Sequence, residues 1–289
     1  MKIDDTYAEA FDGLYSRIII TARDEIYLRT AALGATALPS TVVGRTEGGI
    51  ENWLTPDETP DGRPGVLVQV WGPFKEDPAN FEYEYSLRIR QGILVVPTTA
   101  IFDAANTEKK LDMMNKVGHC GDGYEETVNL YGRDIIAVPL MMGDFLIERY
   151  LGYGKGVMGG NVWFLCESMD VAIEAGEKAV DAILNVQGAI TPFGICSAGS
   201  KVETNYPEIG PTTNHPYCPT LRGKIEDSKV PEGIVSIPEI VINGTTLAVV
   251  KDAMRAAINA AEGVKGVREV SAGNYGGKLG KHKIYLKEL

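Results

Sequence analysis

The chain has few of the residues that build metal centres. Its 289 residues include three histidines and four cysteines, Cys120, Cys166, Cys196 and Cys218. The cysteines are widely spaced, form no Cys-x-x-Cys pair, and have no histidine at ligand spacing. We therefore do not expect a structural zinc site or an iron–sulfur cluster.

Several catalytic motifs are also missing. The sequence has no Gly-x-Ser-x-Gly motif, no phosphate-binding loop, and no Gly-x-Gly-x-x-Gly motif followed by a suitable acid. These absences argue against a serine hydrolase and against a nucleotide-dependent enzyme.

Positive charge and long apolar runs are scarce. Acidic residues outnumber basic ones 39 to 28, which gives a net charge of -11. An acidic chain without Lys/Arg runs is a poor partner for nucleic acid or an anionic membrane. No apolar run approaches the ~18 residues of a membrane span, and no secretion signal begins the chain. We expect a soluble protein of the cytoplasm.

The periodicity predicts a mixed α/β (α+β) fold. A length of 289 residues with 44% hydrophobic content suffices for two domains. The first half alternates strands and helices in two strand–helix–strand units. Such units form the split β-α-β, or ferredoxin-like, arrangement. The elements expected here are strands at residues 17–21, 41–44, 66–71 and 93–97 and helices at 24–35 and 80–90.

Glycine-punctuated hairpins interrupt this alternation. Residues 121–154 combine short strands with turn sequences at 121–124, 131–133 and 142–144. We predict a β-hairpin extension there. Glycines gather at residues 152–160, where we place the boundary between an N-terminal, proximal lobe (residues 1–155) and a C-terminal, distal lobe (residues 156–289).

The second half contains an internal duplication. We expect strands at residues 162–167 and 237–244, and helices at 171–185 and from 245 to 261. With a shift of 74 positions, Ala-Val-Asp-Ala at 179–182 matches Ala-Met-Arg-Ala at 253–256, and Ser-Ala-Gly at 197–199 matches 271–273. This repeat indicates two β-α-β copies. The irregular segment between them, residues 205–230, is typical of a functional or disordered loop.

Glu239 is the strongest catalytic candidate. Side chains alternate along a strand, so Ile237, Glu239 and Val241 share one face. A carboxyl group covered by such neighbours loses hydration, its pKa rises, and its protonated form donates a hydrogen bond to an oxyanion. The alternative is a solvated charge at a sheet edge, a place that Pro238 would suit.

A family resemblance supports the catalytic interpretation. The motifs that carry it are Asp-Thr-Tyr-Ala-Glu-Ala-Phe (5–11), Thr-Pro-Asp-Gly-Arg-Pro-Gly (59–65), Ala-Ile-Phe-Asp-Ala (100–104), Gly-Asp-Gly-Tyr (121–124), Tyr-Cys-Pro-Thr (217–220), Glu-Ile-Val-Ile-Asn-Gly (239–244) and Ser-Ala-Gly-Asn-Tyr-Gly-Gly-Lys-Leu-Gly (271–280). With these motifs, the chain resembles the formylmethanofuran:tetrahydromethanopterin formyltransferases of methanogenic and related archaea along nearly its whole length. The resemblance implies a two-lobed homo-oligomer, typically a tetramer, without a bound metal or prosthetic group.

The resemblance also implies the reaction. Enzymes of this family pass a formyl group between methanofuran and N5 of tetrahydromethanopterin, so these coenzymes are the expected substrates. The tetrahedral intermediate carries developing negative charge on oxygen and needs a preorganised donor. The family's proposed donor is a protonated glutamate, which corresponds to Glu239.

Further substrate contacts are expected in the Gly-rich motif and its first copy. Asn274 and Gly276 offer donors to a pterin or glutamyl tail, although glycines after a strand also mark turns. Ser271 belongs to the same motif. Ser197 and Lys201 can meet carboxylates of the methanofuran tail, or Lys201 is simply solvated.

Four other residues complete the candidate set. Phe102 and Asp103 can stack and orient a flat ring, or Phe102 is part of the core. Asn243 either binds substrate or adopts a turn before Gly244. Cys218 is expected to line the ligand site, because no partner activates it as a nucleophile.

Two rival functions remain open on sequence alone. Paired ferredoxin-like lobes also serve as ligand-sensing or scaffold modules, because a fold does not fix a function. The chain can also be a formyltransferase-like subunit of a larger formyl-hydrolysing complex.

Overall fold

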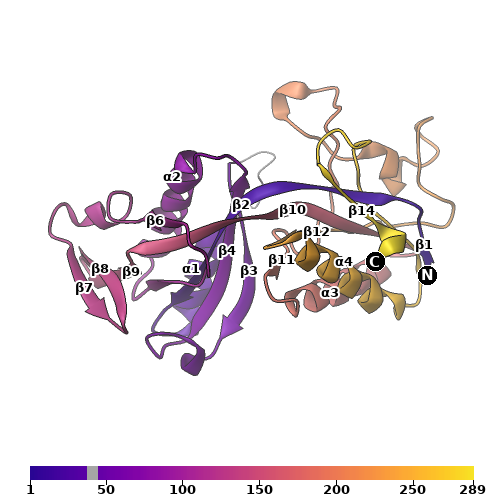
Figure 1. Ribbon diagram of the computed structural model, residues 1–289. Coiled ribbons are helices and arrows are strands. Elements are labelled where there is room, and N and C mark those ends of the chain that lie inside the picture. The colour runs from indigo at the N-terminus through magenta and orange to yellow at the C-terminus, as the bar shows by residue number, and fades with distance from the viewer. Residues whose placement is uncertain (38–44) are drawn as a thin grey trace. The chain divides into compact units, whose positions relative to one another are not determined.

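The computed structural model describes residues 1–37 and 45–289, and the chain forms two compact units (Figure 1). The N-terminal unit is Gly13–Lys155, and the C-terminal unit combines Met1–Asp12 with Gly156–Leu289. The assignment of residues 1–12 to the first lobe is therefore wrong, although the later boundary lies at residue 155 as expected. The reason is strand pairing: β1 (Lys2–Ile3) pairs with β13 (Val267–Ser271), and the start of β2 (Tyr7–Thr21) pairs with β14 (His282–Tyr285).

The N-terminal unit contains the predicted split β-α-β arrangement. Neighbouring strands run in the order β3-β4-β2-β5, and every pair is antiparallel. Helices α1 and α2 contribute to the same buried core as these strands. The elements are β2 (Tyr7–Thr21, which continues into the C-terminal unit), α1 (Glu25–Thr36), β3 (Glu47–Leu54), β4 (Gly65–Pro73), α2 (Ala79–Arg88) and β5 (Ala100–Asp103).

Helix α1 lies where the sequence predicts it. The Asp24 carboxylate caps the helix by accepting hydrogen bonds from the backbone N–H groups of Ile26 and Tyr27 at 3.1 and 3.3 Å. Leu28 and three alanines at helical spacing form its buried face. A capping residue followed by this apolar spacing is why the helix was predictable.

The strand expected at residues 93–97 is absent. Helix α2 instead continues into a π-helical turn, η2 (Ile89–Leu94), and the next strand is β5. Ile89 and Ile93 are buried in the core from this turn. A short apolar run cannot be assigned to strand or helix from periodicity alone, which explains the error. The strand expected at residues 41–44 lies outside the described residues.

The predicted hairpin extension is present. Tyr131 and Gly132, both with positive φ, form the turn between β7 and β8, as expected of a two-residue hairpin. Strand β9 pairs with β8 and, in parallel, with β5. The extension comprises β6 (Lys110–Asp112), β7 (Glu126–Leu130), β8 (Arg133–Leu140) and β9 (Gly143–Glu148).

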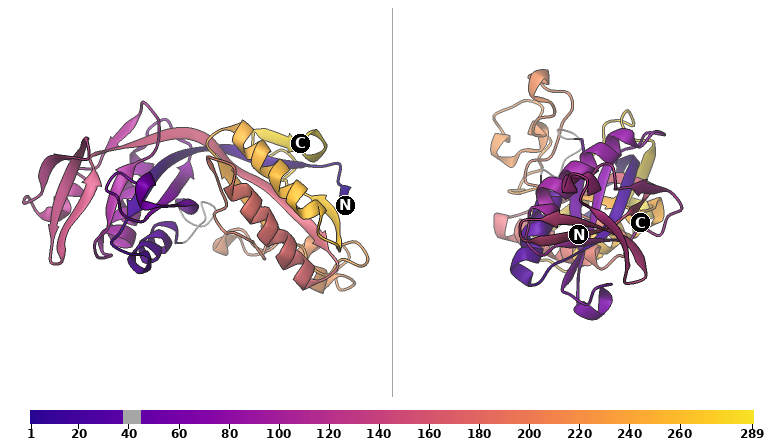
Figure 2. Two further views of the ribbon diagram at one scale, coloured as in Figure 1. Left: turned by 90° about the horizontal axis from the view of Figure 1, so that it is seen from below. Right: turned by 90° about the vertical axis from the view of Figure 1, so that its left-hand side faces the viewer.

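The C-terminal unit repeats the ferredoxin-like order. Its strands follow β13-β10-β12-β11 in antiparallel pairs, and β1 adds to β13 in parallel. Helices α3 and α4 lie side by side on one face (Figure 2) and pack through small residues. The elements are β10 (Tyr150–Cys166, shared with the N-terminal unit), α3 (Met169–Leu184), β11 (Ala189–Ile190), β12 (Glu239–Gly244), α4 (Leu247–Glu262), β13 (Val267–Ser271) and β14 (His282–Tyr285).

The two β-α-β copies of this unit are related by 78 positions rather than 74. Ser168 caps α3 and Thr246 caps α4. The pairing is reciprocal, since Glu167 donates its N–H to the carbonyl of Gly266 and Thr245 donates to that of Gly188, each at 3.1 Å. The two shifts, 74 and 78 positions, differ by four residues, which is about one helical turn. Alanines of the two helices therefore still match when the sequences are aligned with a shift of 74.

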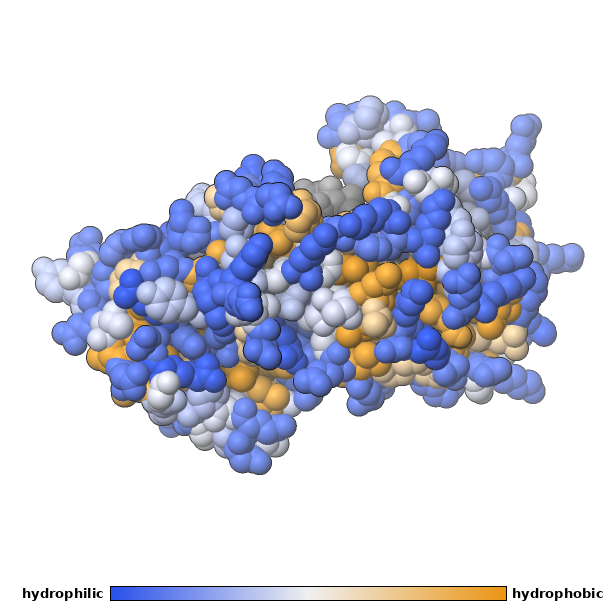
Figure 3. Space-filling view, viewed as in Figure 1, coloured by the Kyte–Doolittle hydropathy of each residue, from blue (hydrophilic) through white to orange (hydrophobic). Residues whose placement is uncertain are grey.

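Alanine residues also lie on the partly exposed side of helix α4. Hydrophobic residues gather over α3 and α4 on the face drawn in Figure 3. Ala256 and Ala260 are half-buried there, while Ala253 and Ala257 lie fully inside. In the part of the chain that the structure describes, no helix is long and apolar enough to cross a membrane.

Candidate active site

Glu239 is buried at the start of β12, next to the C-terminal part of β10. Its side chain is 8% exposed. Trp163 of β10 pairs directly with Glu239 on one side and with Ser271 of β13 on the other. Cross-strand neighbours project to the same face, so the indole of Trp163 lies beside the carboxyl group. The alternative of a solvated surface charge is thereby excluded.

Two side chains act on the Glu239 carboxyl group. The indole Nε1–H of Trp163 donates a hydrogen bond to Oε1 at 2.8 Å. The neighbouring thiol of Cys196 lowers the pKa of the carboxyl group. The backbones of Cys196 and Glu239 form a β-bridge with N–H···O distances of 2.8 and 3.0 Å, which fixes the thiol beside the acid.

This environment favours the neutral acid. Burial raises the pKa of Glu239, and the hydrogen bonds from Trp163 and Cys196 oppose that shift without reversing it. Burial also raises the pKa of Cys196, and the neighbouring Glu239 adds to the effect. Both shifts favour the protonated forms of the acid and the thiol, and a carboxyl group must be protonated if it is to donate a hydrogen bond.

A cavity of about 330 Å³ opens onto this acid. A volume near 300 Å³ is at the lower end of small-molecule sites, and an apolar wall with a few convergent polar groups is their usual composition. The edge of Trp163 packs on the ring of Tyr217, with ring centroids 4.8 Å apart. The wall includes Trp163, Ile173, Ile195, Ser197, Ala198, Asn214, Tyr217, Cys218, Val235, Ile237 and Glu239.

Glycine at position 273 leaves room for the indole. A Cβ atom added there would lie 2.7 Å from Cζ2 of Trp163. The amide side chain of Asn161 clamps this backbone: Oδ1 accepts from the N–H of Gly273 at 2.6 Å, and Nδ2 donates to its carbonyl at 3.1 Å. The Ser-Ala-Gly sequence thus positions Trp163 rather than a substrate directly.

The Gly-rich loop after β13 wraps around a carboxylate that the sequence analysis missed. Glu9 of β2 is 3% exposed and accepts from the backbone N–H groups of Tyr275, Gly277, Leu279 and Gly280. Burial alone would raise the pKa of Glu9, but these four donors hold it below its ordinary value. Glu9 therefore anchors the loop as an ion.

Three expected substrate contacts belong to this anchored loop. Asn274 donates to Thr6 Oγ1 and to the carbonyl of Tyr7, and Gly276 forms a turn with positive φ. Ser271 donates to Asp4 at 2.8 Å. Their polar groups are engaged within the unit, and none of the three lines the cavity of Glu239.

The remaining candidates lie in several places. Cys218 lines the cavity beside Asn214, as expected. Asn243 is buried and accepts from the N–H of Gly159. Lys201 forms a backbone bridge with Thr212. Phe102 is a core residue of the N-terminal unit, and the neighbouring Asp103 forms an ion pair with Lys110 at 2.5 Å.

Most of the cavity wall could not be read from the sequence. Trp163 and Tyr217 are far apart in the chain and meet only in the folded unit, and Cys196 reaches Glu239 only through a β-bridge. The repeated Ser-Ala-Gly motif was one weak signal in the sequence. Ser200 directly follows the first copy, and its hydroxyl bonds to that of Tyr275, which lies four residues after Ser271 of the second copy. Only Glu239, Ser197 and Cys218 among the wall residues were expected.

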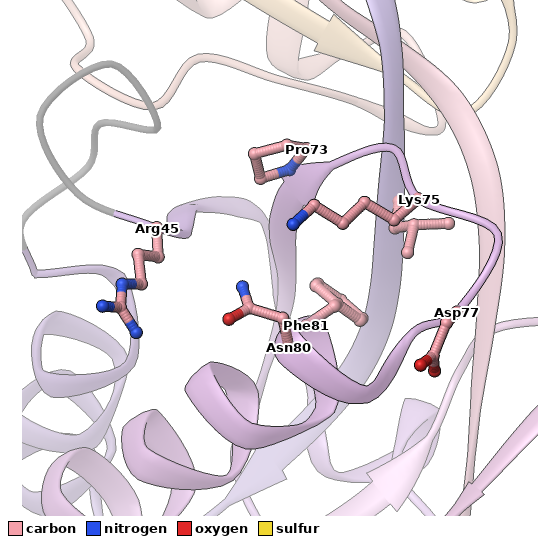
Figure 4. A pocket seen from close by; sticks show the side chains of 7 residues that line it. Arg45, Pro73, Lys75, Asp77, Asn80 and Phe81 are labelled. Carbon is pink, nitrogen blue, oxygen red and sulfur yellow. The ribbon is translucent and has the colours of Figure 1, made fainter.

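A second cavity lies in the N-terminal unit, between the loop that follows β4 and helix α2 (Figure 4). Lys75 and Asn80 are among its polar residues, and Arg45 at its rim forms an ion pair with Glu84 at 3.0 Å. It holds no buried acid. Across residues 1–37 and 45–289, no group of three or more His, Cys, Asp or Glu residues is arranged to hold a metal ion.

The fold and the site define a class. Two split β-α-β units, one with a buried glutamic acid of raised pKa at the base of a small-molecule cavity, form a scaffold suited to transfer reactions that develop an oxyanion.

Comparison with known proteins narrows this class to one family. The model of formylmethanofuran-tetrahydromethanopterin formyltransferase matches residues 1–140, and the model of its proximal lobe matches residues 143–289. The chain belongs to the formylmethanofuran-tetrahydromethanopterin formyltransferase family. The family's proximal lobe is the C-terminal one, so the lobe names expected from the sequence are reversed.

Full-length relatives fall under two names. A formyltransferase-like protein of Archaeoglobus fulgidus is 58% identical, with 100% of this chain and 96% of the relative covered. A protein of Methanocaldococcus jannaschii named as the formyltransferase itself is 44% identical, with 99% and 97% covered. This chain is thus more similar to the first, a formyltransferase-like protein, than to the second.

Two solved structures share the fold. The formyltransferase from Methanosarcina barkeri is 41% identical with a TM-score of 0.92, and 100% of this chain and 98% of that chain are covered. A chain of the formyltransferase/hydrolase complex from Methylorubrum extorquens, solved with methylofuran, is 36% identical with a TM-score of 0.91 and covers 99% and 96%.

Proposed function

We propose that this protein transfers a formyl group between formylmethanofuran and N5 of tetrahydromethanopterin by direct attack. The observation that supports this proposal most strongly is the buried acid Glu239 at the base of a ligand-sized cavity, in a chain of the formyltransferase family. The relatives named as formyltransferases supply the substrate class.

The proposed step needs one donor and two bound amines. The N5 lone pair attacks the formyl carbon, a C–N bond forms, and the carbonyl electron pair moves to oxygen. The O–H of Glu239 donates to that oxygen while the charge develops. The oxygen then returns its electron pair, the bond to the methanofuran nitrogen breaks, and the released amine gains the proton that N5 loses. The apolar wall excludes the water that would hydrolyse the formyl group.

Turnover by the purified chain tests the proposal. Formylmethanofuran and tetrahydromethanopterin are incubated with the protein, and the absorbance of formyl-tetrahydromethanopterin is followed. Glu239→Ala is expected to lower kcat by about 10²- to 10³-fold, the usual loss of one oxyanion donor. Glu239→Gln is expected to lose less, because its amide still donates. Wild-type turnover in the alanine variant would refute the role of Glu239.

A second candidate function is that of a subunit in a formyl-hydrolysing complex. The likeness to a chain of the Methylorubrum formyltransferase/hydrolase complex and to proteins named only formyltransferase-like favours it. Activity of the isolated chain supports the first proposal, and activity that depends on added partner subunits supports the second. Ligand binding without turnover in either assay would support a sensor or scaffold.

The proposal extends to assembly, cofactors and location. We propose a homotetramer that works in the cytoplasm without a bound metal or prosthetic group, as the family resemblance implies. Light scattering measures the assembly, and turnover after exhaustive chelation tests the metal requirement. A monomer, or activity restored only by an added ion, would refute these points.

A further inference from the structure

The Glu239 carboxyl group has two oxygens in different surroundings. Trp163 Nε1–H donates to Oε1 at 2.8 Å, and indole has no acceptor to offer in return. In a neutral acid the carbonyl oxygen is the better acceptor, so this bond favours the tautomer with the proton on Oε2.

The thiol of Cys196 provides the second contact. The backbone of Cys196 forms a β-bridge with that of Glu239, so the two side chains are neighbours, and the hydrogen bond of the thiol lowers the pKa of the carboxyl group. The residues on either side of Cys196, Ile195 and Ser197, line the cavity. A thiol is a weak hydrogen-bond donor.

We infer that Trp163 and Cys196 are positioning residues for the single proton of Glu239: Trp163 holds Oε1 as the acceptor and leaves the proton on Oε2 for a substrate oxygen, and Cys196, the β-bridge neighbour of Glu239, supplies a second donor to the carboxyl group. This inference rests on the proposed formyl transfer for its catalytic meaning. The placement of the proton itself is a property of the resting protein.

The neighbouring groups allow this assignment. Among the described residues, Trp163 donates to the acid and Cys196 lowers its pKa. Other titratable groups near it include Tyr217 and Cys218 of the same cavity wall and Tyr275 of the loop after β13. The hydroxyl of Tyr275 is bonded to that of Ser200 at 2.9 Å.

Infrared difference titration tests the placement without turnover. The carboxylic C=O band of Glu239, identified by its loss in Glu239→Gln, is followed with rising pH. Trp163→Phe removes one donor that favours the charged form, so the band is expected to persist to higher pH than in the wild type. Cys196→Ala is expected to shift it in the same direction, and Cys196→Ser, which keeps a donor, to shift it less.

Turnover measurements test the catalytic role of Trp163. Trp163→Phe is expected to lower kcat by about tenfold with little change in KM. This loss of rate is smaller than the roughly hundredfold loss that a 1 Å misplacement of a catalytic group causes. The upper limb of the pH profile of Trp163→Phe is expected to move to higher pH. A merely structural role would lower the rate and leave that limb in place.

A matched tryptophan provides the control. Trp71 is also buried and donates through Nε1, to Gln69 at 2.8 Å, in the N-terminal unit. Trp71→Phe is expected to leave the Glu239 band unshifted. If Trp163→Phe does not fold, the pair Cys196→Ala and Cys196→Ser carries the test. An unmoved band in the folded variants overturns the inference, whereas a shifted band in a protein that never transfers formyl refutes the proposed function alone.

Discussion

Two buried glutamates of the C-terminal unit have pKa values shifted in opposite directions, and their donors explain the difference. Glu9 receives four backbone N–H groups, which hold its pKa down despite burial. Glu239 receives one indole N–H and one thiol, and burial raises its pKa. Removal from water costs a carboxylate several kcal/mol unless strong donors replace the solvent. One acid is therefore a structural anion, and the other is kept available as a proton donor.

Gly273→Ala tests how closely the indole is held. The added Cβ would lie 2.7 Å from Trp163 Cζ2, and overpacking of this kind costs about 1–3 kcal/mol of unfolding free energy. We expect that loss in urea unfolding, together with slower turnover. In a Trp163→Phe background the cost is expected to shrink, because the smaller ring leaves space.

Gly263→Ala is the control for this substitution. Gly263 follows α4 with φ of -78°, and a Cβ there meets nothing within 4 Å. We expect no loss of stability from it. Equal costs for Gly273→Ala in both Trp163 backgrounds would show that the indole is not the group displaced.

At the scale of single elements, the Gly-rich loop depends on the charge of Glu9. Because the folded pKa of Glu9 is lowered, its stabilisation is present above the unfolded pKa and is lost as pH falls through the folded value. The unfolded carboxyl titrates near 4.5. Glu9→Gln is therefore expected to destabilise the wild type at neutral pH, and the difference in unfolding free energy is expected to narrow below about pH 4.5.

Chemical denaturation at several pH values measures this difference. A gap between Glu9→Gln and the wild type that stays constant from neutral pH down to strongly acid pH would show that ionisation of Glu9 does not hold the loop. Hydrogen exchange of the amides of Gly277 and Gly280 reports on the loop directly, since both donate to Glu9.

The duplicated β-α-β copies predict equivalent helix caps. The side chains of Ser168 and Thr246 each accept from the backbone N–H three residues later at 3.2 Å. Replacement of either by Ala is expected to cost about 1 kcal/mol of unfolding free energy. The exchanges Ser168→Thr and Thr246→Ser keep the capping oxygen and are expected to cost only a few tenths. A large loss from only one of the two alanine variants would contradict the equivalence.

Elements with local signals were predictable, whereas the site depended on distant pairing. Asp24, a capping residue before apolar residues at helical spacing, predicted helix α1. The alternation of side chains along the strand around Glu239 predicted a buried acid. The run at residues 93–97 has no such cap, and its burial in a π-helical turn follows from tertiary packing. Trp163 and Cys196 act on Glu239 through strand register, which a single sequence does not encode locally.

At the scale of the whole molecule, the C-terminal unit is built from two separate segments of the chain. Residues 1–12 supply β1, the first part of β2 and the Glu9 anion to the C-terminal unit. A fragment of residues 156–289 therefore lacks the strand partner of β14 and leaves the four loop N–H groups without their acceptor. Unsatisfied buried donors each cost about 1–3 kcal/mol, a large share of the stability of a small domain.

We expect the fragment of residues 156–289 to lack a cooperative unfolding transition. A circularly permuted fragment that carries residues 1–12 after a flexible linker behind Leu289 is expected to recover it, because strand and anion are both restored. The same permuted fragment with Glu9→Gln is expected to recover only part of the stability, which separates the role of the charge from that of strand pairing. Calorimetry and amide hydrogen exchange measure all three. Cooperative folding of the fragment without residues 1–12 would show that the N-terminal segment merely covers a unit that is complete without it.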